Sequence, residues 1–91
     1  MEEWREIVGS KGQYFVSNQG RVKNKKGLIM KQRINNWGYP CVTLSGYIAK
    51  HDAKVHRLVA DAFLGGGGRV YHLNRNKQDN RVENLVRQAD E

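Results

Sequence analysis

One stretch of the sequence has the hydrophobic spacing of an α-helix, and this feature limits the folds open to the chain. Apolar side chains occur there at positions i, i+3, i+4, i+7 and i+8, which are Val55, Leu58, Val59, Ala62 and Phe63. This spacing predicts an amphipathic helix over 55–64. The glycines at 65–68 should end it, because glycine loses more backbone entropy in a helix than any other residue. A chain of 91 residues forms one folding unit, so other elements must complete the core around this helix.

The remaining sequence has the pattern of short strands joined by turns. Residues 14–16 and 21–23 flank Ser17-Asn18-Gln19-Gly20, in which Gly20 can adopt a positive φ, and this arrangement predicts a β-hairpin. Further strands are expected at 4–8, 39–45 and 70–73, and a short helix or turn at 81–86. Pro40 should lie at a sheet edge or among the first residues of its strand. One helix among several short strands indicates an α+β fold.

The chain is strongly basic. Sixteen Lys and Arg against nine Asp and Glu give a net charge of +7, which favours a polyanionic partner such as nucleic acid. The same charge would also serve binding to an acidic protein, or solubility alone. No apolar run approaches the roughly 20 residues that span a bilayer, and the acidic start differs from a signal peptide. We therefore expect no membrane partner and a cytoplasmic location.

Basic residues are concentrated on the predicted hairpin. Arg21, Lys23, Lys25 and Lys26 lie on or beside it, in a geometry suited to following a phosphate backbone. The alternative interpretation is a solvated edge whose lysines prevent edge-to-edge strand pairing. The single Cys41 excludes an internal disulfide and a cysteine-based zinc site, and its apolar surroundings predict a small buried side chain.

Two other clusters have metal-ligand chemistry, and each has a simpler interpretation. His51, Asp52 and His56 are close in sequence, but a change from strand to helix between them favours His56 as a residue that caps or flanks the helix start. A second cluster is rich in oxygen and consists of Asn74, Asn76, Asp79 and Asn80. Calcium would use such oxygens, but no Glu follows at EF-hand spacing, so loop shaping is the favoured interpretation.

Two sequence blocks together resemble a known family. The first block contains Tyr14, Val16, Ser17, Asn18, Gly20, Arg21 and Val22. It resembles NUMOD4, a small β module often fused to homing endonucleases. The second block, VHRLVADAFL followed by VYHLNRNKQDNRVENL, resembles the HNH nuclease segment of phage and intron homing endonucleases. The resemblance implies a NUMOD4-like β module at 1–46 and an HNH-like segment of the ββα-metal type at 47–91.

The resemblance also implies roles for individual residues. Family members cleave DNA with one divalent metal and a His that activates the attacking water, which makes His72 the general base and Asn84 the structural Asn that braces the loop. Mg²⁺ or Mn²⁺ is the implied cofactor of an active protein. The DNA contacts are expected from Arg21, Lys23, Lys25 and Lys26 of the hairpin and from Arg75, Lys77 and Arg81 of the Asn-rich loop.

The chain departs from the family pattern at the expected metal ligands. Tyr71 occupies the position before His72, where members carry Asp or Asn, and a neutral phenol is a weak ligand for a hard cation. The helix that closes the ββα motif, and its ligand, are expected to be missing, because none of residues 85–91 is His or Asn. Asp90 and Glu91 are oxygen donors, but a terminal segment rarely holds a metal ligand in place.

These departures lead to one expected function and two alternatives. We expect a duplex-DNA-binding protein of phage or mobile-element type, derived from an HNH homing endonuclease and without efficient cleavage. DNA binding, rather than catalysis, is therefore its expected main activity. The first alternative is an active, metal-dependent HNH endonuclease or nickase. The second is a phage-encoded inhibitor that binds a host defence or nucleic-acid enzyme, for example of the anti-CRISPR type.

Overall fold

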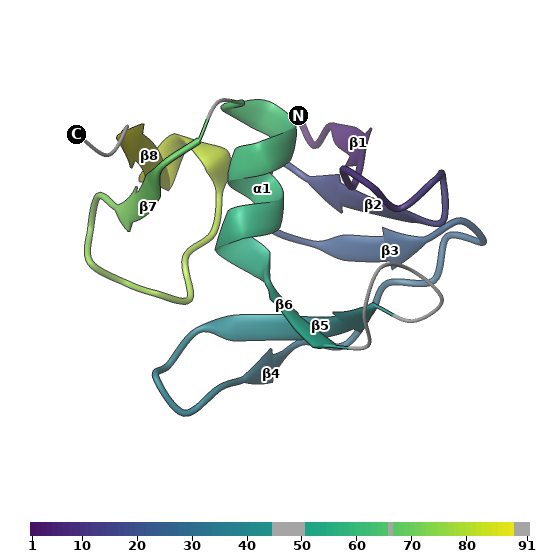
Figure 1. Cartoon of the computed structure of the whole chain (residues 1–91), viewed down its shortest axis with the longest axis horizontal. Coiled ribbons are helices and arrows are strands. Elements are labelled where there is room, and N and C mark those ends of the chain that lie inside the picture. Colours follow the sequence, from purple (N-terminus) through teal and green to yellow (C-terminus); the bar gives the residue numbers. More distant parts are fainter. Residues whose placement is uncertain (45–50, 66, 89–91) are drawn as a thin grey trace.

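The computed structural model describes residues 1–44, 51–65 and 67–88, with the backbone alone at 51 and 52 (Figure 1). Its first sheet contains the antiparallel strands β1 (Trp4–Glu6), β2 (Tyr14–Ser17) and β3 (Val22–Asn24), in that order. The predicted hairpin is confirmed, since β2 and β3 pair with Val16 opposite Val22. Gly20 closes the turn with a φ of 85°, a left-handed conformation that glycine adopts without a Cβ clash.

A second antiparallel sheet follows, with β5 (Pro40–Leu44) between β4 (Arg33–Ile34) and β6 (His51–Lys54). Pro40 is the first residue of β5, as predicted, where its missing N–H does not interrupt the ladder. The side chain of Asn35 shapes the turn between β4 and β5, because its Oδ1 accepts hydrogen bonds from the backbone N–H groups of Trp37 and Tyr39. Cys41 is buried as predicted, with 2% of its surface exposed.

The predicted helix is confirmed as α1 (Val55–Phe63). It is the one α-helix among the residues that the structure describes. Beyond it, β7 (Arg69–His72) pairs with β8 (Leu85–Gln88), and a single 3₁₀ turn, η1 (Val82–Asn84), precedes β8. The predicted helix or turn at 81–86 was therefore wrong over its last two residues. Pairing with β7 outweighs the local preference there, because it satisfies the backbone groups of Leu85 and Val86.

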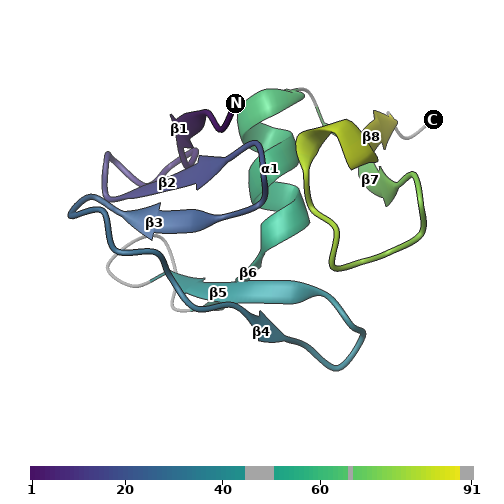
Figure 2. The same cartoon turned by 180° about the vertical axis from the view of Figure 1, so that it is seen from behind.

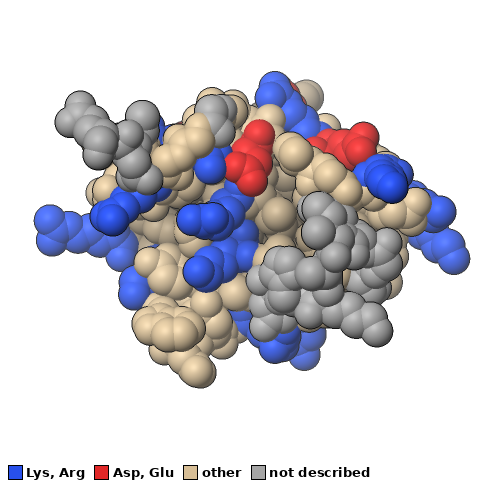
Figure 3. Space-filling model, viewed as in Figure 1, with Lys and Arg blue, Asp and Glu red and all other residues tan. Residues whose placement is uncertain are grey.

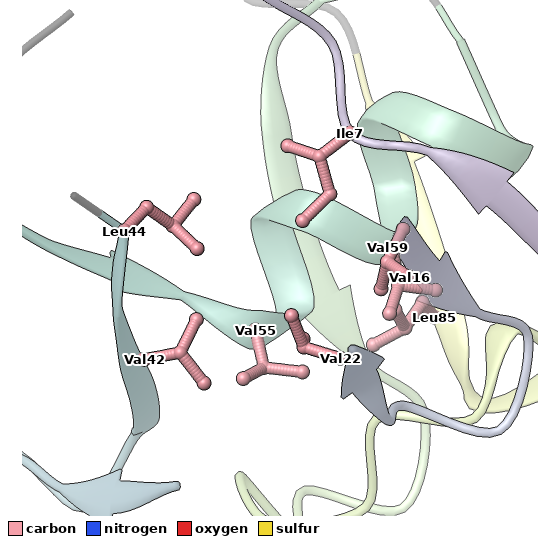
Figure 4. Close-up of a cluster of buried hydrophobic side chains, with 8 residues drawn as sticks. All are labelled: Ile7, Val16, Val22, Val42, Leu44, Val55, Val59 and Leu85. Atoms are coloured by element: carbon pink, nitrogen blue, oxygen red, sulfur yellow. The ribbon is translucent and has the colours of Figure 1, made fainter. Parts of the chain in front are cut away.

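Helix α1 lies between the first sheet and the β7–β8 pair, and both views show this arrangement (Figures 1 and 2). Its apolar face meets one buried cluster, drawn in Figure 4, that contains Ile7, Val16, Val22, Val42, Leu44, Val55, Val59 and Leu85. The cluster takes residues from both predicted segments, 1–46 and 47–91, so the segments share one core. The α+β prediction is confirmed. None of the helices among the described residues has the length and apolarity to cross a membrane.

Candidate active site and nucleic-acid interface

His72 is the last residue of β7, where it pairs with Leu85 of β8. Its side chain is half-buried, and its Nε2 lies 2.7 Å from Oδ1 of Asn80 in the loop that follows β7. Asn80 is itself buried, with 4% of its surface exposed. The expected general base therefore stands at a strand end with one ring nitrogen held by a buried amide, an interaction that the sequence does not indicate.

The loop between β7 and η1 is built around Asn84. The Nδ2 of this buried residue donates hydrogen bonds to Oδ1 of Asn74 and to the backbone oxygen of Asp79, both at 2.9 Å. Its Oδ1 accepts a hydrogen bond from the backbone N–H of Asn74 at 3.1 Å. These bonds cross the loop at its base, a geometry that fits the bracing role implied by the family resemblance for Asn84.

The oxygen-rich side chains of the same loop serve its backbone. Oδ1 of Asn74 accepts a hydrogen bond from the N–H of Asn76, and Oδ1 of Asn76 accepts one from Gln78. Such side-chain to main-chain bonds are typical of polar turns and fit the loop-shaping interpretation. The side chains of His51 and Asp52 lie outside the described residues, so the metal hypothesis for that cluster stays a prediction.

His56 lies at the start of α1, as predicted, but its side chain is buried. Lys54 is the residue that precedes the first turn of α1, with no side-chain cap, whereas His56 lies inside the helix with 6% of its surface exposed. His56 lies in the first turn of α1, so the prediction that it caps or flanks the helix start is right about its place and wrong only about capping, because its ring turns inward. The ring centroid lies 5.3 Å from that of His72 and 4.9 Å from that of Tyr39.

Burial determines the charge of His56. Its Nδ1 has no hydrogen-bond partner in the part of the chain that the structure describes. Burial, followed by the nearby His72, Arg57 and Lys54, lowers the pKa of His56 to about 4. The imidazole is therefore neutral near pH 7, and an uncharged ring packs beneath the expected base.

Within the described residues, the phenol and carboxylate groups near His72 are poorly suited to hold a hard divalent cation. Tyr71 is exposed and offers a phenol, and both carboxylate oxygens of Asp79 accept hydrogen bonds from Arg81. Those bonds, together with one from Asn74, hold the pKa of the Asp79 carboxyl well below its usual range. Among the described residues, no three His, Cys, Asp or Glu side chains are grouped to hold a metal.

Two of the expected DNA-binding residues, Arg21 and Arg81, are paired with acids. Nε of Arg21 donates a hydrogen bond of 2.9 Å to Glu2, and this contact lowers the pKa of the Glu2 carboxyl to about 2. Arg81 is paired with Asp79 in the same way. Such pairs leave less charge for a phosphate than an unpaired cation does.

The other cations of the set form two groups that lie apart. Lys23 has its Nζ 4.2 Å from the ring centroid of Trp4, and Lys25 and Lys26 are exposed in the segment that follows β3. That segment is at the end of the molecule away from β7 (Figures 1 and 2). Lys77 and the exposed Arg75 lie in the loop beside His72, where Nζ of Lys77 donates a hydrogen bond of 2.8 Å to the backbone oxygen of Trp37.

A basic groove that the sequence does not indicate lies on the second sheet. Its volume is about 410 Å³, and it is lined by Arg33, Ile34, Asn35, Asn36, Trp37, Cys41 and Lys54. Lys54 reaches this groove because β5 and β6 pair with Cys41 opposite Lys54. Trp37 is 70% exposed at the turn, and Lys77 links that turn to the His72 loop.

Basic side chains are spread over much of the face in Figure 3, including β7, the first turns of α1 and the second sheet, and the acidic side chains on this face lie toward the end of α1 and toward β1, next to further basic ones. We call Arg33, Lys54 and Lys77 the groove patch, and Lys23, Lys25 and Lys26 the hairpin patch. The groove patch and His72 meet at Tyr39, whose ring centroid lies 4.9 Å from Nζ of Lys77 and 6.2 Å from the His72 ring.

The chain is similar to proteins of known families. The NUMOD4 motif matches residues 2–45, and the HNH endonuclease family matches residues 53–87. The DNA endonuclease I-HmuI of Bacillus phage SP01 is 39% identical over 87 residues, which cover 91% of this chain and 50% of that protein. An uncharacterized HNH endonuclease of Acanthamoeba polyphaga mimivirus, L247, is 38% identical over 92% of this chain and 23% of its own length.

A solved structure of the phage relative is also similar to this chain. The structure described as DNA binding and cleavage by the HNH homing endonuclease I-HmuI matches 96% of this chain and 52% of its own with a TM-score of 0.84 and 37% identity. The chain thus spans about half the length of the phage relative and less of the mimivirus protein.

Proposed function

This chain belongs to the HNH homing endonucleases that carry an N-terminal NUMOD4 motif, and from that premise we propose that it binds duplex DNA with the backbone lying along the groove patch beside His72. One observation carries the proposal: Lys77 contacts both the Trp37 turn of the groove and the Tyr39 ring that neighbours His72. Cations, an exposed indole and the expected base therefore converge on one surface.

The chemistry of the surface suits a phosphate backbone. Exposed lysines contribute non-directional attraction to phosphates, and an exposed aromatic ring beside them can contact a sugar or base edge. The longest dimension of the molecule is 35 Å, close to the rise of one turn of B-DNA, about 34 Å. The hairpin patch at the far end adds a second set of phosphate contacts.

We further propose that this chain cleaves DNA inefficiently by itself. HNH endonucleases generally use a divalent metal, which neutralises charge on the phosphate and the leaving oxygen while the base activates water. His72 supplies the base, but the neighbouring position holds the phenol of Tyr71, and the Asp79 carboxylate is engaged by Arg81. A base without well-placed metal ligands accelerates phosphodiester hydrolysis little.

The salt dependence of binding tests the DNA proposal. We expect the logarithm of the affinity for a duplex to fall linearly with the logarithm of the salt concentration. With about five phosphate contacts, the slope of this line should be about −4.5. Fluorescence anisotropy of a labelled duplex measures this slope. A slope near zero, or no binding at low salt, would contradict the proposal.

The variant Tyr71→Asp tests the metal argument. A carboxylate at this position is expected to strengthen Mn²⁺ binding, because hard cations prefer carboxylate oxygen to a neutral phenol. Calorimetric titration with Mn²⁺ alone measures the change, and Tyr71→Phe is the matched control without an oxygen. Equal Mn²⁺ affinity of the Asp and Phe variants would show that position 71 does not face the metal.

A further inference from the structure

The turn of the NUMOD4 hairpin packs directly against the loop that follows His72. The backbone oxygen of Asn18 accepts a hydrogen bond of 2.8 Å from the N–H of Val82. Gly20 is buried against Asn80 so closely that a Cβ at position 20 would lie 3.1 Å from both the Cβ and the backbone oxygen of Asn80. Residues about sixty positions apart in the chain thus form one tight junction.

Asn80 connects this junction to the expected base. Its Oδ1 lies 2.7 Å from Nε2 of His72, and an amide oxygen can only accept a hydrogen bond. The neutral imidazole must then carry its proton on Nε2 and keep the lone pair on Nδ1. Nδ1, which has no hydrogen bond to any of the residues that the structure describes, is therefore the nitrogen able to take a proton.

We propose that Asn80 is a positioning residue that fixes the tautomer of His72, and that the NUMOD4 turn holds Asn80 in place through Gly20. The value of this arrangement for DNA chemistry rests on the proposed function, whereas the tautomer itself does not. The NUMOD4 motif then has a second role besides contacting DNA, because it is a structural support of the HNH site.

Gly20 is the point at which this support can be weakened selectively. An alanine at position 20 would be strained by the φ of 85° and would also press on the backbone of Asn80, which cannot move as a flexible side-chain end can. Gly27 is the matched control. It has a φ of 89°, but a Cβ there would meet nothing within 4 Å. The two alanine variants share the strain and differ in the contact with Asn80.

The experiment is ¹⁵N NMR of the full chain at a pH where His72 is neutral, with long-range ¹H–¹⁵N correlations that distinguish the two tautomers. We expect predominantly the Nε2–H tautomer of His72 in the wild type and in Gly27→Ala, and a mixture in Gly20→Ala. Amide shifts of α1 report on folding. A predominant Nδ1–H tautomer in the wild type, or a folded Gly20→Ala whose His72 signals match Gly27→Ala, would overturn the proposal.

Substitutions of Asn80 make the test independent of Gly20. Asn80→Asp keeps an oxygen acceptor and should preserve the Nε2–H tautomer, while Asn80→Ala should raise the share of the Nδ1–H tautomer. Identical tautomer populations in the two variants would also overturn the proposal. The spectra need no DNA, so a failure of the proposed function would appear in the anisotropy titration and not in this measurement.

Discussion

Replacing the groove patch, Arg33, Lys54 and Lys77, by Gln should lower the affinity of the protein for duplex DNA by roughly two orders of magnitude at about 0.1 M salt. Each phosphate contact contributes about 0.9 to the magnitude of the salt slope. The loss of three contacts should therefore change the slope from about −4.5 in the wild type to about −2 in the variant. Anisotropy titrations of the wild type and the variant at several salt concentrations measure both quantities.

The hairpin patch provides a comparison with the same change in charge. The variant with Lys23, Lys25 and Lys26 replaced by Gln should reduce the slope by about two, because Lys23 lies near the carboxylate of Glu2 and is partly neutralised. Thermal stability should hardly change, since exposed lysines contribute little to folding. Lys11→Gln removes an exposed charge outside both patches. If Lys11→Gln lowers the DNA affinity as much per removed charge as the groove-patch variant does, the DNA does not lie in the groove.

The stability of the protein should fall as the pH is lowered from about 6.5 to 4, and His56 should account for much of the loss. The folded pKa of His56, about 4, lies below its unfolded value of 6.5, so the unfolded chain binds more protons in this window. Stability is therefore retained above pH 6.5 and lost toward pH 4. The difference corresponds to roughly 3 kcal/mol of unfolding free energy.

The variant His56→Phe isolates this effect. Phe keeps a ring beside Tyr39, removes the titrating group and removes the buried Nδ1 that lacks a partner. Urea unfolding at several pH values should give a flatter curve for the variant than for the wild type. His72→Ala is the control, and it should keep most of the pH dependence because burial is the main cause of the shift. Parallel curves for the wild type and His56→Phe would contradict the assignment.

The local features of the fold could be predicted from sequence, because they depend on neighbours in the chain. The spacing from Val55 to Phe63 is enough for the helix, and the turn before Gly20 is enough for the hairpin. Strand β8 could not be predicted at 85–86, since its conformation depends on pairing with β7. A short segment beside a turn has no periodicity long enough to distinguish strand from helix.

The candidate site was predictable only in part, because some of its contacts join residues that are far apart in the chain. The family motif points to His72 and Asn84 by their order in the chain. The groove patch depends on the register that places Lys54 opposite Cys41, and the contact between Gly20 and Asn80 depends on how the hairpin docks. His56 followed the pattern of a helix-start residue in sequence, but tertiary packing placed its ring against Tyr39 and His72.

The most direct test of the central claim combines binding and cleavage on one substrate. Supercoiled plasmid is incubated with the wild type or His72→Ala in Mg²⁺ or Mn²⁺, at protein concentrations that give a complete gel shift, and nicked product is measured over time. We predict that both proteins shift the plasmid fully and that their slow nicking rates are the same. A plasmid that does not shift, or robust wild-type nicking that disappears in His72→Ala, would contradict the account.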